Sequence, residues 1–266
     1  MNDFSFDIQT RESKDSPFIV IYGPAGVGKT TFASNAKNNV VLQTEQGSGE
    51  LKLRTLKDGV FTTYNEFISA LRYIYANPES IDTVVIDSID HLEPLVWNQV
   101  CEDHNWDSIE SPGYGKGYLE ADRYWQRLIK ALNRLRSDKN ISIVAIAHDI
   151  VRIVNDPTAE PYDAHDFKLH KRAVALWKEN ADVIGLIRNP VSVDQKTGKV
   201  KGGSTPTLYT RPSAAYIAKS RYNKMPALMP VKVDSGWDDF AKYIPALQET
   251  GLDEILNNAE TNGEDA

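Results

Sequence analysis

Short apolar runs alternate with segments of helical periodicity along most of this chain. The apolar runs are rich in residues that favour strands. Strands are predicted at Phe18–Tyr22, Val40–Leu42, Thr83–Ile86 and Ile141–Ala147. Helices are predicted at about 29–37, 65–76, 119–137 and 168–180. Alternating strands and helices are typical of an α/β protein with a mostly parallel sheet, and we expect residues 1–235 to form one domain of this class.

The pattern changes in the last third of the chain. The runs Val183–Ile187, Thr207–Thr210 and Ala214–Lys219, with a Lys-Thr-Gly-Lys turn between the first two, predict an antiparallel extension of the sheet. A C-terminal helix is expected within residues 236–256, at about 237–247. Residues 257–266 are acidic and lack apolar anchors, so we expect a disordered tail. Phe4, Phe6 and Ile8 alternate as in a first strand.

Composition excludes several classes of protein. No apolar run approaches the ~18 residues of a membrane span, and the N-terminus lacks the features of a secretory signal. Cys101 is the only cysteine, which suits a reducing cytoplasm. The net charge of −7 is unevenly placed, because residues 188–224 are strongly basic and residues 234–266 strongly acidic. A basic segment of this kind keeps nucleic acid open as a partner.

A glycine-rich loop follows the first predicted strand and precedes a predicted helix. Glycines allow the tight turn that aims successive N–H groups at phosphate oxygens, and the following helix directs its positive end at the same place. Lys29 is placed to neutralise phosphates, and we expect it to be exposed to them rather than packed. The predicted nucleotide-binding residues are Gly23, Pro24, Ala25, Gly26, Val27, Gly28, Lys29, Thr30 and Thr31. The expected ligand is ATP with Mg²⁺.

Two further carboxylates complete the predicted ATPase site. Asp87 ends a strand of β-forming residues, and with the Thr30 hydroxyl it is the expected ligand of Mg²⁺. Hydrolysis also needs a general base, and the position after Asp87 is a serine rather than a glutamate. Glu45 lies just beyond the second strand, beside the phosphates in a parallel sheet, and is preferred as the base to Asp90.

The order of these motifs resembles the core of a RecA-fold ATPase. The matching segments are Gly23–Thr31, Glu45, Val84–Ser88, Ile143–His148, Lys219–Arg221 and Gly113–Tyr118. Over about residues 15–235 the chain is similar to small RecA-like ATPases of tailed phages, including the Sak-type single-strand annealing proteins, and to AAA-domain nucleotide-binding proteins. The resemblance implies a RecA-like core, ATP with Mg²⁺, ring or filament homo-oligomers, and single-stranded DNA as partner.

The resemblance also implies roles for individual residues. Glu45 matches the catalytic glutamate and Asp87 the magnesium-coordinating aspartate. His148 matches the residue that senses the γ phosphate; a capping histidine is the alternative. Lys219 and Arg221 match a Lys-x-Arg pair that reaches the nucleotide of the next subunit; surface salt bridges are the alternative.

Three segments are candidates for binding single-stranded DNA. Residues 112–118 combine glycines, two tyrosines and a lysine; 149–170 is predicted to be a long irregular stretch; and 188–211 is predicted to be a basic hairpin. Their candidate contacts are Tyr114, Lys116, Tyr118, Arg152, Lys196, Lys199 and Lys201. An ordinary packed turn and a solvated hairpin are the alternatives for the first and the last.

Together these observations predict a cytoplasmic ATPase of the RecA-like class (in the host cytoplasm if phage-encoded). It would bind single-stranded DNA in recombination or annealing, with a single-strand-binding or replication protein as a further partner. A regulatory or loader ATPase that acts on a protein is the first alternative, and a nucleotide or small-molecule kinase is the second. A non-enzymatic nucleotide switch remains open if Glu45 is not a base.

Overall fold

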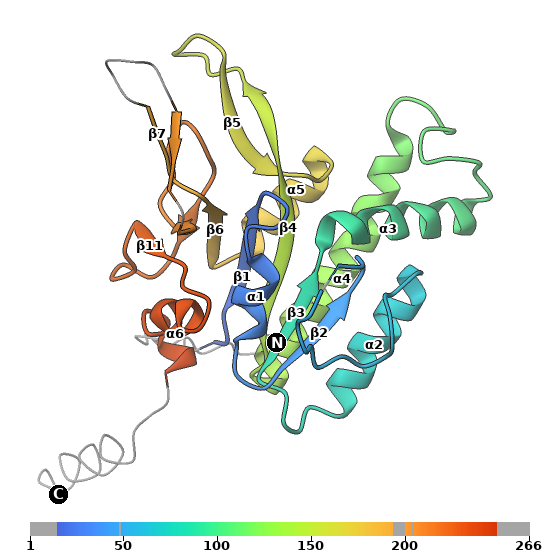
Figure 1. The fold of residues 1–266 in the computed structure, drawn as a ribbon. Coiled ribbons are helices and arrows are strands. Elements are labelled where there is room, and N and C mark those ends of the chain that lie inside the picture. The colour runs from blue at the N-terminus through green and yellow to red at the C-terminus, as the bar shows by residue number, and fades with distance from the viewer. Residues whose placement is uncertain (1–14, 48, 194–199, 204, 249–266) are drawn as a thin grey trace, which may run out of the picture.

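The computed structural model describes residues 15–47, 49–193, 200–203 and 205–248. A nine-stranded sheet runs through it in the order β11-β9-β6-β1-β4-β3-β2 (Figure 1), with β10 beside β6 and β5 beside β4. The central strands pair in parallel: β6 (Val183–Arg188), β1 (Phe18–Gly23), β4 (Ser142–Val154), β3 (Thr83–Asp87) and β2 (Asn39–Gln43). The predicted mostly parallel α/β fold is confirmed.

Helices cover both faces of the sheet (Figure 1). On one face pack α2 (Tyr64–Ala76), α3 (Ile89–His104), α4 (Lys116–Lys139) and α5 (Lys171–Asn180). On the other pack α1 (Lys29–Ser34) and α6 (Gly236–Ala241), followed by the 3-10 helix η1 (Pro245–Leu247). Side chains of a strand alternate between faces, so β1 sends Phe18, Val20 and Tyr22 into the larger core and Ile19 and Ile21 into the smaller one.

Strand β4 corrects one prediction. It continues past the sheet to Val154, and β5 (Tyr162–Phe167) returns beside it in antiparallel pairing, so Asp149 lies opposite Phe167. Residues 149–167 are therefore a β-hairpin and not a long irregular stretch. The two hairpin strands satisfy each other's backbone hydrogen bonds, which is why the segment extends beyond the sheet.

The region after β6 agrees with the prediction only in part. Strands β7 (Val191–Val193) and β8 (Val200–Gly202) form a separate two-stranded sheet. The main sheet is extended by β9 (Thr207–Tyr209), which pairs antiparallel with β6 as predicted, and by β11 (Leu228–Pro230), which was not predicted. The predicted strand 214–219 is wrong, because Tyr216 forms only isolated bridges, to Ser213 and His165, and the strand there is the short β10 (Lys219–Ser220), which pairs with β6.

Several helix boundaries in the structure differ from those predicted from the sequence. Helix α1 ends at Ser34 rather than near 37, and α5 begins at Lys171 rather than 168. Helix α6 packs against the rest of the domain. Its Trp237 and Phe240 lie edge-on against Phe32 of α1. The helix predicted at about 237–247 ends at Ala241 and is followed by the separate turn η1. The expected strand at Phe4–Ile8, residues 249–256 and the acidic tail lie outside the described residues. None of the helices in the described part combines the length and apolar character of a membrane span.

Candidate active site

The glycine-rich loop joins the end of β1 to the start of α1. Gly23 has to be glycine because a Cβ there would lie 2.0 Å from the carbonyl oxygen of Ile187. Gly28, directly before α1, has φ +93°, a backbone conformation that residues other than glycine rarely adopt. A Cβ at Gly28 would meet no other atom within 4 Å, so the space over the loop is open. The loop is thus an open, glycine-lined cradle at a helix N-terminus.

Lys29 lies inside this cradle. Its ammonium group donates to the carbonyl oxygens of Gly23 and Pro24 at 2.9 and 2.8 Å. Only 6% of the residue is exposed, so the expectation of an exposed lysine is wrong. Burial lowers the pKa of Lys29, and the nearby carboxylates of Asp87 and Asp90 oppose that shift. A buried cation held by two carbonyl groups is readily re-directed to a phosphate.

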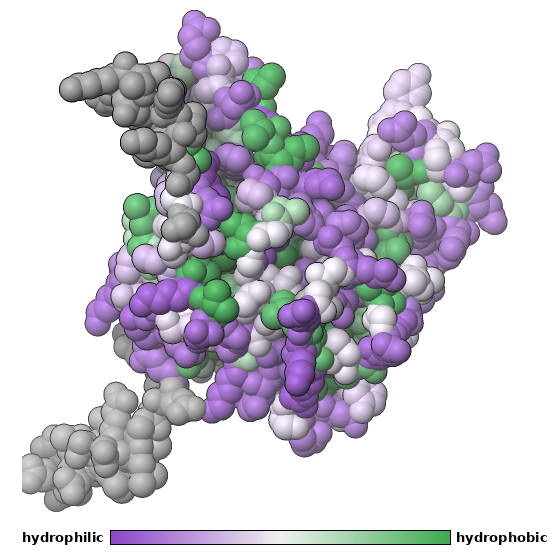
Figure 2. All heavy atoms as spheres, in the orientation of Figure 1, coloured by the Kyte–Doolittle hydropathy of each residue, from purple (hydrophilic) through white to green (hydrophobic). Residues whose placement is uncertain are grey.

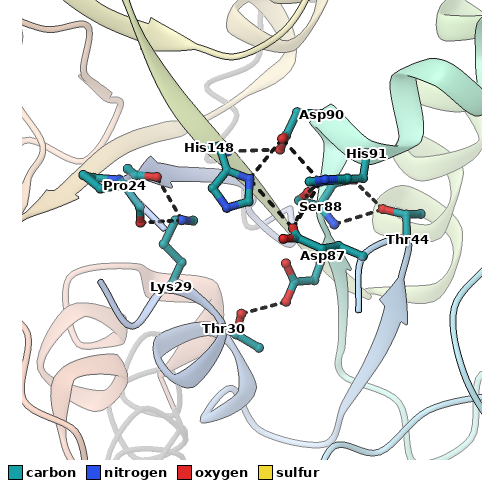
Figure 3. Close-up of polar contacts among 11 residues, drawn as sticks. Pro24, Lys29, Thr30, Thr44, Asp87, Ser88, Asp90, His91 and His148 are labelled. Atoms are coloured by element: carbon teal, nitrogen blue, oxygen red, sulfur yellow. Dashed lines mark hydrogen bonds and ion pairs between the residues drawn. The ribbon is translucent and has the colours of Figure 1, made fainter. Parts of the chain in front are cut away.

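Asp87 and Thr30 meet at the end of β3. The Thr30 hydroxyl donates to Asp87 Oδ2 at 2.7 Å (Figure 3). Asp87 is 9% exposed, and its burial raises the pKa of the carboxyl group, against the hydrogen bond from Thr30. A hydroxyl and a carboxylate beside a phosphate cradle are the oxygen ligands that Mg²⁺ prefers. These residues therefore fit Mg²⁺ with a nucleoside triphosphate.

A cluster of two carboxylates and two histidines lies beside Asp87 (Figure 3). Asp90 accepts hydrogen bonds from the backbone N–H and ring Nδ1 of His148, both at 3.0 Å. Glu45 Oε2 lies 3.1 Å from Nδ1 of His91 and 3.8 Å from Nδ1 of His148. The hydroxyl of Ser88 lies 2.9 Å from His91 Nδ1 and 3.3 Å from Glu45.

The two candidate bases differ in burial and in partners. The side chain of Asp90 is 2% exposed, and although burial raises the pKa of its carboxyl group, the hydrogen bonds from His148 lower it to about 2. The Glu45 side chain is 32% exposed. Asp90 is thus committed to orienting His148, whereas Glu45 retains access to solvent. This difference supports the preference for Glu45, whose role stays a prediction.

One cavity of about 240 Å³ brings the predicted residues together. It is lined by the glycine-rich loop, by the segment after β2, by Asp87 and by His148. Lys29, Thr30, Glu45, Asp87 and His148, which come from one helix, two strands and the segment after β2, all face it. The C-terminal edge of a parallel sheet is where such a site is expected.

His91 and Thr44 belong to this neighbourhood and were not predicted. The Thr44 hydroxyl donates to the Ser88 carbonyl at 2.6 Å and accepts from its N–H at 3.0 Å, which fixes the turn after Asp87. His91 follows Ser88 by three residues, so its position on the first turn of α3 brings it back over Ser88. The three-residue spacing of Ser88 and His91 could have indicated this contact, but only if residues 89–104 had been recognised as a helix.

Lys219 and Arg221 lie away from this cavity. The Lys219 ammonium donates to the carbonyl oxygen of Lys178 at 2.9 Å, near the end of α5. Arg221 forms an ion pair with Asp182 at 2.8 Å, and Asp182 also pairs with Arg136. Asp182 thus supplies the anion beside Arg221 within the same chain, which is the salt-bridge alternative. The action of Lys219 and Arg221 on a neighbouring subunit's nucleotide stays a prediction.

The candidate DNA contacts that the structure describes come from α4 and the turn before it, from β4 and from β8. Tyr114 is fully exposed, whereas Lys116 and Tyr118 belong to the first turn of α4, so residues 112–118 are only partly a loop. Tyr118 stacks on His170 with ring centroids 4.1 Å apart, so it packs on the fold. Arg152 points inward: its guanidinium donates to the carbonyl oxygens of Phe167 and Leu169. Lys196 and Lys199 lie outside the described residues, and Lys201 belongs to β8.

A further carboxylate next to the site gives a stability prediction. Glu93 is 6% exposed, accepts the backbone N–H of His170 at 2.9 Å, and burial raises the pKa of its carboxyl group to about 7. The folded state therefore binds this proton more tightly than the unfolded one, and stability is lost as pH rises from about 4.5 to about 7. Glu93→Gln removes the buried charge, so at pH ~8 it is expected to raise the free energy of unfolding by up to about 3 kcal/mol.

Urea unfolding of the parent and Glu93→Gln, run at several pH values, measures this effect. The gap between the two proteins should shrink as pH falls and close at about pH 3, where the parent carboxyl group is almost fully neutral in both states. Glu50→Gln is the matched control, because Glu50 is exposed. A gap that is the same at every pH would contradict the assignment.

Comparison with known proteins agrees with this geometry. A family model described as an AAA domain matches residues 16–222, which is more than half of the chain and contains every residue of the cavity. No curated protein matches the sequence.

Proposed function

The chain belongs to this AAA domain family of P-loop ATPases, and we propose that it hydrolyses Mg·ATP and couples hydrolysis to single-stranded DNA in phage-type recombination or strand annealing. The observation that supports hydrolysis is the convergence of Lys29, the Thr30–Asp87 pair and Glu45 on one cavity. Mg²⁺, when bound, supplies positive charge to the phosphate oxygens.

Each residue has a distinct task in this proposal. Lys29 exchanges its two loop carbonyls for phosphate oxygens and neutralises their charge. Thr30 and Asp87, which now share a hydrogen bond, would supply oxygen atoms to hold the cation. Glu45 orients a water molecule and accepts its proton, because its carboxylate is exposed at the cavity.

His148 is the proposed link between the nucleotide and the rest of the protein. It lines the cavity and lies on β4, directly before the part of that strand that forms the hairpin with β5. Asp90 holds its ring and its backbone N–H. A change in the hydrogen-bond partners of His148 would therefore move the base of the hairpin. We propose that the site senses the γ phosphate through this movement.

Single-stranded DNA is the proposed partner because of charge. Residues 188–224 are strongly basic in a chain of net charge −7. The β7–β8 hairpin, which carries Lys201, follows the end of β6, and β6 ends at the same sheet edge as β1 and its phosphate loop. Basic residues at this edge suit an anionic strand whose binding depends on the nucleotide. In this proposal homo-oligomers act on the strand, with Lys219 and Arg221 contributing between subunits.

The deciding experiment measures ATP turnover with no nucleic acid, with single-stranded DNA, with duplex DNA and with RNA. Stimulation by single-stranded DNA above the other three supports the proposal. Turnover that none of them changes would contradict the DNA-linked part and leave ATP hydrolysis intact. Absence of turnover under every condition, in a protein that binds ATP, would instead favour a nucleotide switch.

One observation favours a protein partner as a second candidate. The β4–β5 hairpin exposes Ile150, Val151 and Ile153, which are 40%, 53% and 68% exposed, and Figure 2 shows apolar side chains over this part of the molecule. Residues 149–168 hold five acids and two bases. An apolar and acidic hairpin suits a protein surface better than a DNA strand, and it supports a regulatory or loader ATPase.

The basic segment gives a test of the DNA proposal. Binding to single-stranded DNA should weaken with salt, with a log–log slope of about −0.7 for each phosphate contacted. Replacing Lys196, Lys199 and Lys201 together with Gln removes three cations, and we expect the slope to become less negative by up to about 2. Fluorescence anisotropy of a labelled oligonucleotide at several salt concentrations measures it.

A triple variant outside the basic segment provides the matched control. Lys52, Lys130 and Lys232 are exposed, so their replacement by Gln changes the net charge equally. If the slope is the same in the parent and in the 196/199/201 variant, the DNA contacts lie elsewhere.

A further inference from the structure

A second, larger cavity lies on the helical layer, away from the nucleotide site. It has a volume of about 560 Å³ and lies between α2 and α4. Arg72 of α2 and Arg127 and Arg134 of α4 line it, together with the aromatic rings of Tyr64, Tyr75 and Tyr124. We call this cavity the arginine groove.

The three arginines have their charge available. All three are exposed, and among the described residues none of them forms an ion pair. Arg127 lies over the ring of Tyr124, with its guanidinium carbon 5.3 Å from the ring centroid, which orients the group without neutralising it.

The carboxylates near the groove are engaged by other groups. Asp103, which lines it, accepts hydrogen bonds from the Tyr124 hydroxyl and, at 2.9 Å, from Gln99. Asp138 accepts from the Tyr75 hydroxyl at 2.8 Å. With one acid against three arginines, the lining of the groove is positive. Such a surface fits an extended anionic segment that can pair with several guanidinium groups.

The sequence itself contains a segment of matching charge. Residues 249–266 hold six acids and no lysine or arginine. They also hold Leu252, Ile255 and Leu256, whose side chains suit the tyrosine walls of the groove. Charge and apolar character are therefore both complementary.

The segment starts close enough to reach the groove. Gln248 lines a small cavity together with Asp82 and Thr83, at the start of β3. Asn140, the C-cap residue of α4, lines the same cavity. Arg134 is in the last two turns of α4, so it lies toward the same edge of the sheet. Eighteen residues span up to about 60 Å when extended and about 25 Å as a flexible coil.

We propose that the acidic segment 249–266 of this chain docks in the arginine groove. Exposed ion pairs are individually weak, but attachment to the same chain gives the segment a local concentration of about 1 mM or more. Docking is therefore intramolecular, held by several weak pairs, and sensitive to salt. While the segment is docked, the groove is closed to other anionic partners.

Energy transfer between two dyes on the full-length protein tests this. Cys101→Ser removes the native thiol, and Ser69→Cys on the exposed side of α2 and Thr261→Cys in the acidic segment accept the dyes. At about 50 mM NaCl we expect high transfer efficiency, falling at least about twofold at about 500 mM NaCl. Replacing Arg72, Arg127 and Arg134 together with Gln should give the low value at both salt concentrations.

The control changes the same charge elsewhere. Replacing the exposed Lys52, Lys224 and Lys232 with Gln should leave the transfer efficiency at its parent value. Circular dichroism shows whether the arginine variant folds. If it does not, the six acids of residues 249–266 are neutralised instead, which removes the anionic partner of each ion pair. The transfer efficiency must then fall as far as it is expected to fall in the arginine variant. Equal efficiency in the parent and in the groove variant, or the same loss in the control variant, would overturn the proposal. So would transfer that appears only between singly labelled chains mixed together, because a second copy would then fill the groove.

Discussion

Replacing Glu45 with Gln is expected to slow ATP hydrolysis by about 10²–10⁴-fold while Mg·ATP remains bound. Glutamine keeps the size and polarity of the side chain but accepts no proton from water. The residues that hold the nucleotide are untouched, because Lys29 bonds to Gly23 and Pro24, and Thr30 bonds to Asp87. Single-turnover hydrolysis gives the rate, and equilibrium titration with a fluorescent ATP analogue gives the affinity.

Asp90→Asn is the matched comparison, because both carboxylates lie beside His148. Asn retains an acceptor for the backbone N–H of His148 but loses the charge that holds its ring. If Asp90 only positions His148, Asp90→Asn should change hydrolysis less than Glu45→Gln does. A large loss in Asp90→Asn with normal turnover in Glu45→Gln would transfer the role of base to Asp90.

The phosphate loop and Asp87 were predictable because their signals are local. A β-rich run, three glycines, Lys29 and Thr30 follow one another within a few residues, and Asp87 directly ends a strand. Backbone geometry then leaves little choice: the carboxyl ends of β1 and β3 lie at one edge of a parallel sheet, with β4 between them. The meeting of Thr30 with Asp87 follows from that arrangement.

Helix α3 was missed for a physical reason. Asp90, Glu93 and Gln99 are buried on it, so polar residues occupy positions where helical periodicity requires apolar ones. Pro94 also lies within the helix and is a strong breaker in sequence interpretation. The buried carboxylates are bonded to His148 and His170, far along the chain, and sequence alone gives no sign of these partners.

The β4–β5 hairpin was missed because its stability is not local. Polar residues and prolines between 149 and 170 are typical of a loop, and the strands hold together by pairing, as between Asp149 and Phe167. Arg152 was counted as a free cation for the same reason, whereas the return of β5 gives it backbone carbonyls to bind. Arg221 is the parallel case, since Asp182 lies 39 positions away in sequence.

Replacing Lys29 with Ala is expected to weaken ATP binding by about 10²–10³-fold, which corresponds to about 3–4 kcal/mol and lies within the range measured for truncating one partner of a buried charge pair. No other lysine or arginine lines the nucleotide cavity among the residues that the structure describes, so no neighbouring cation replaces it. Titration with a fluorescent ATP analogue measures the change. Because ligand that binds only the folded state raises the unfolding temperature, Mg·ATP should stabilise the parent against heat and leave the variant almost unchanged.

The burial of Lys29 makes the choice of control important. Alanine removes a charge, two hydrogen bonds to Gly23 and Pro24 and the volume of the side chain at once. Lys29→Met removes the charge and the hydrogen bonds but fills the space, so it separates loss of phosphate binding from collapse of the loop. We expect both variants to lose ATP affinity alike, and only Lys29→Ala to lose thermal stability through the cavity it leaves. Parent-like affinity in Lys29→Met would show that the phosphates do not lie on this loop, and the assignment of the whole site would then be wrong.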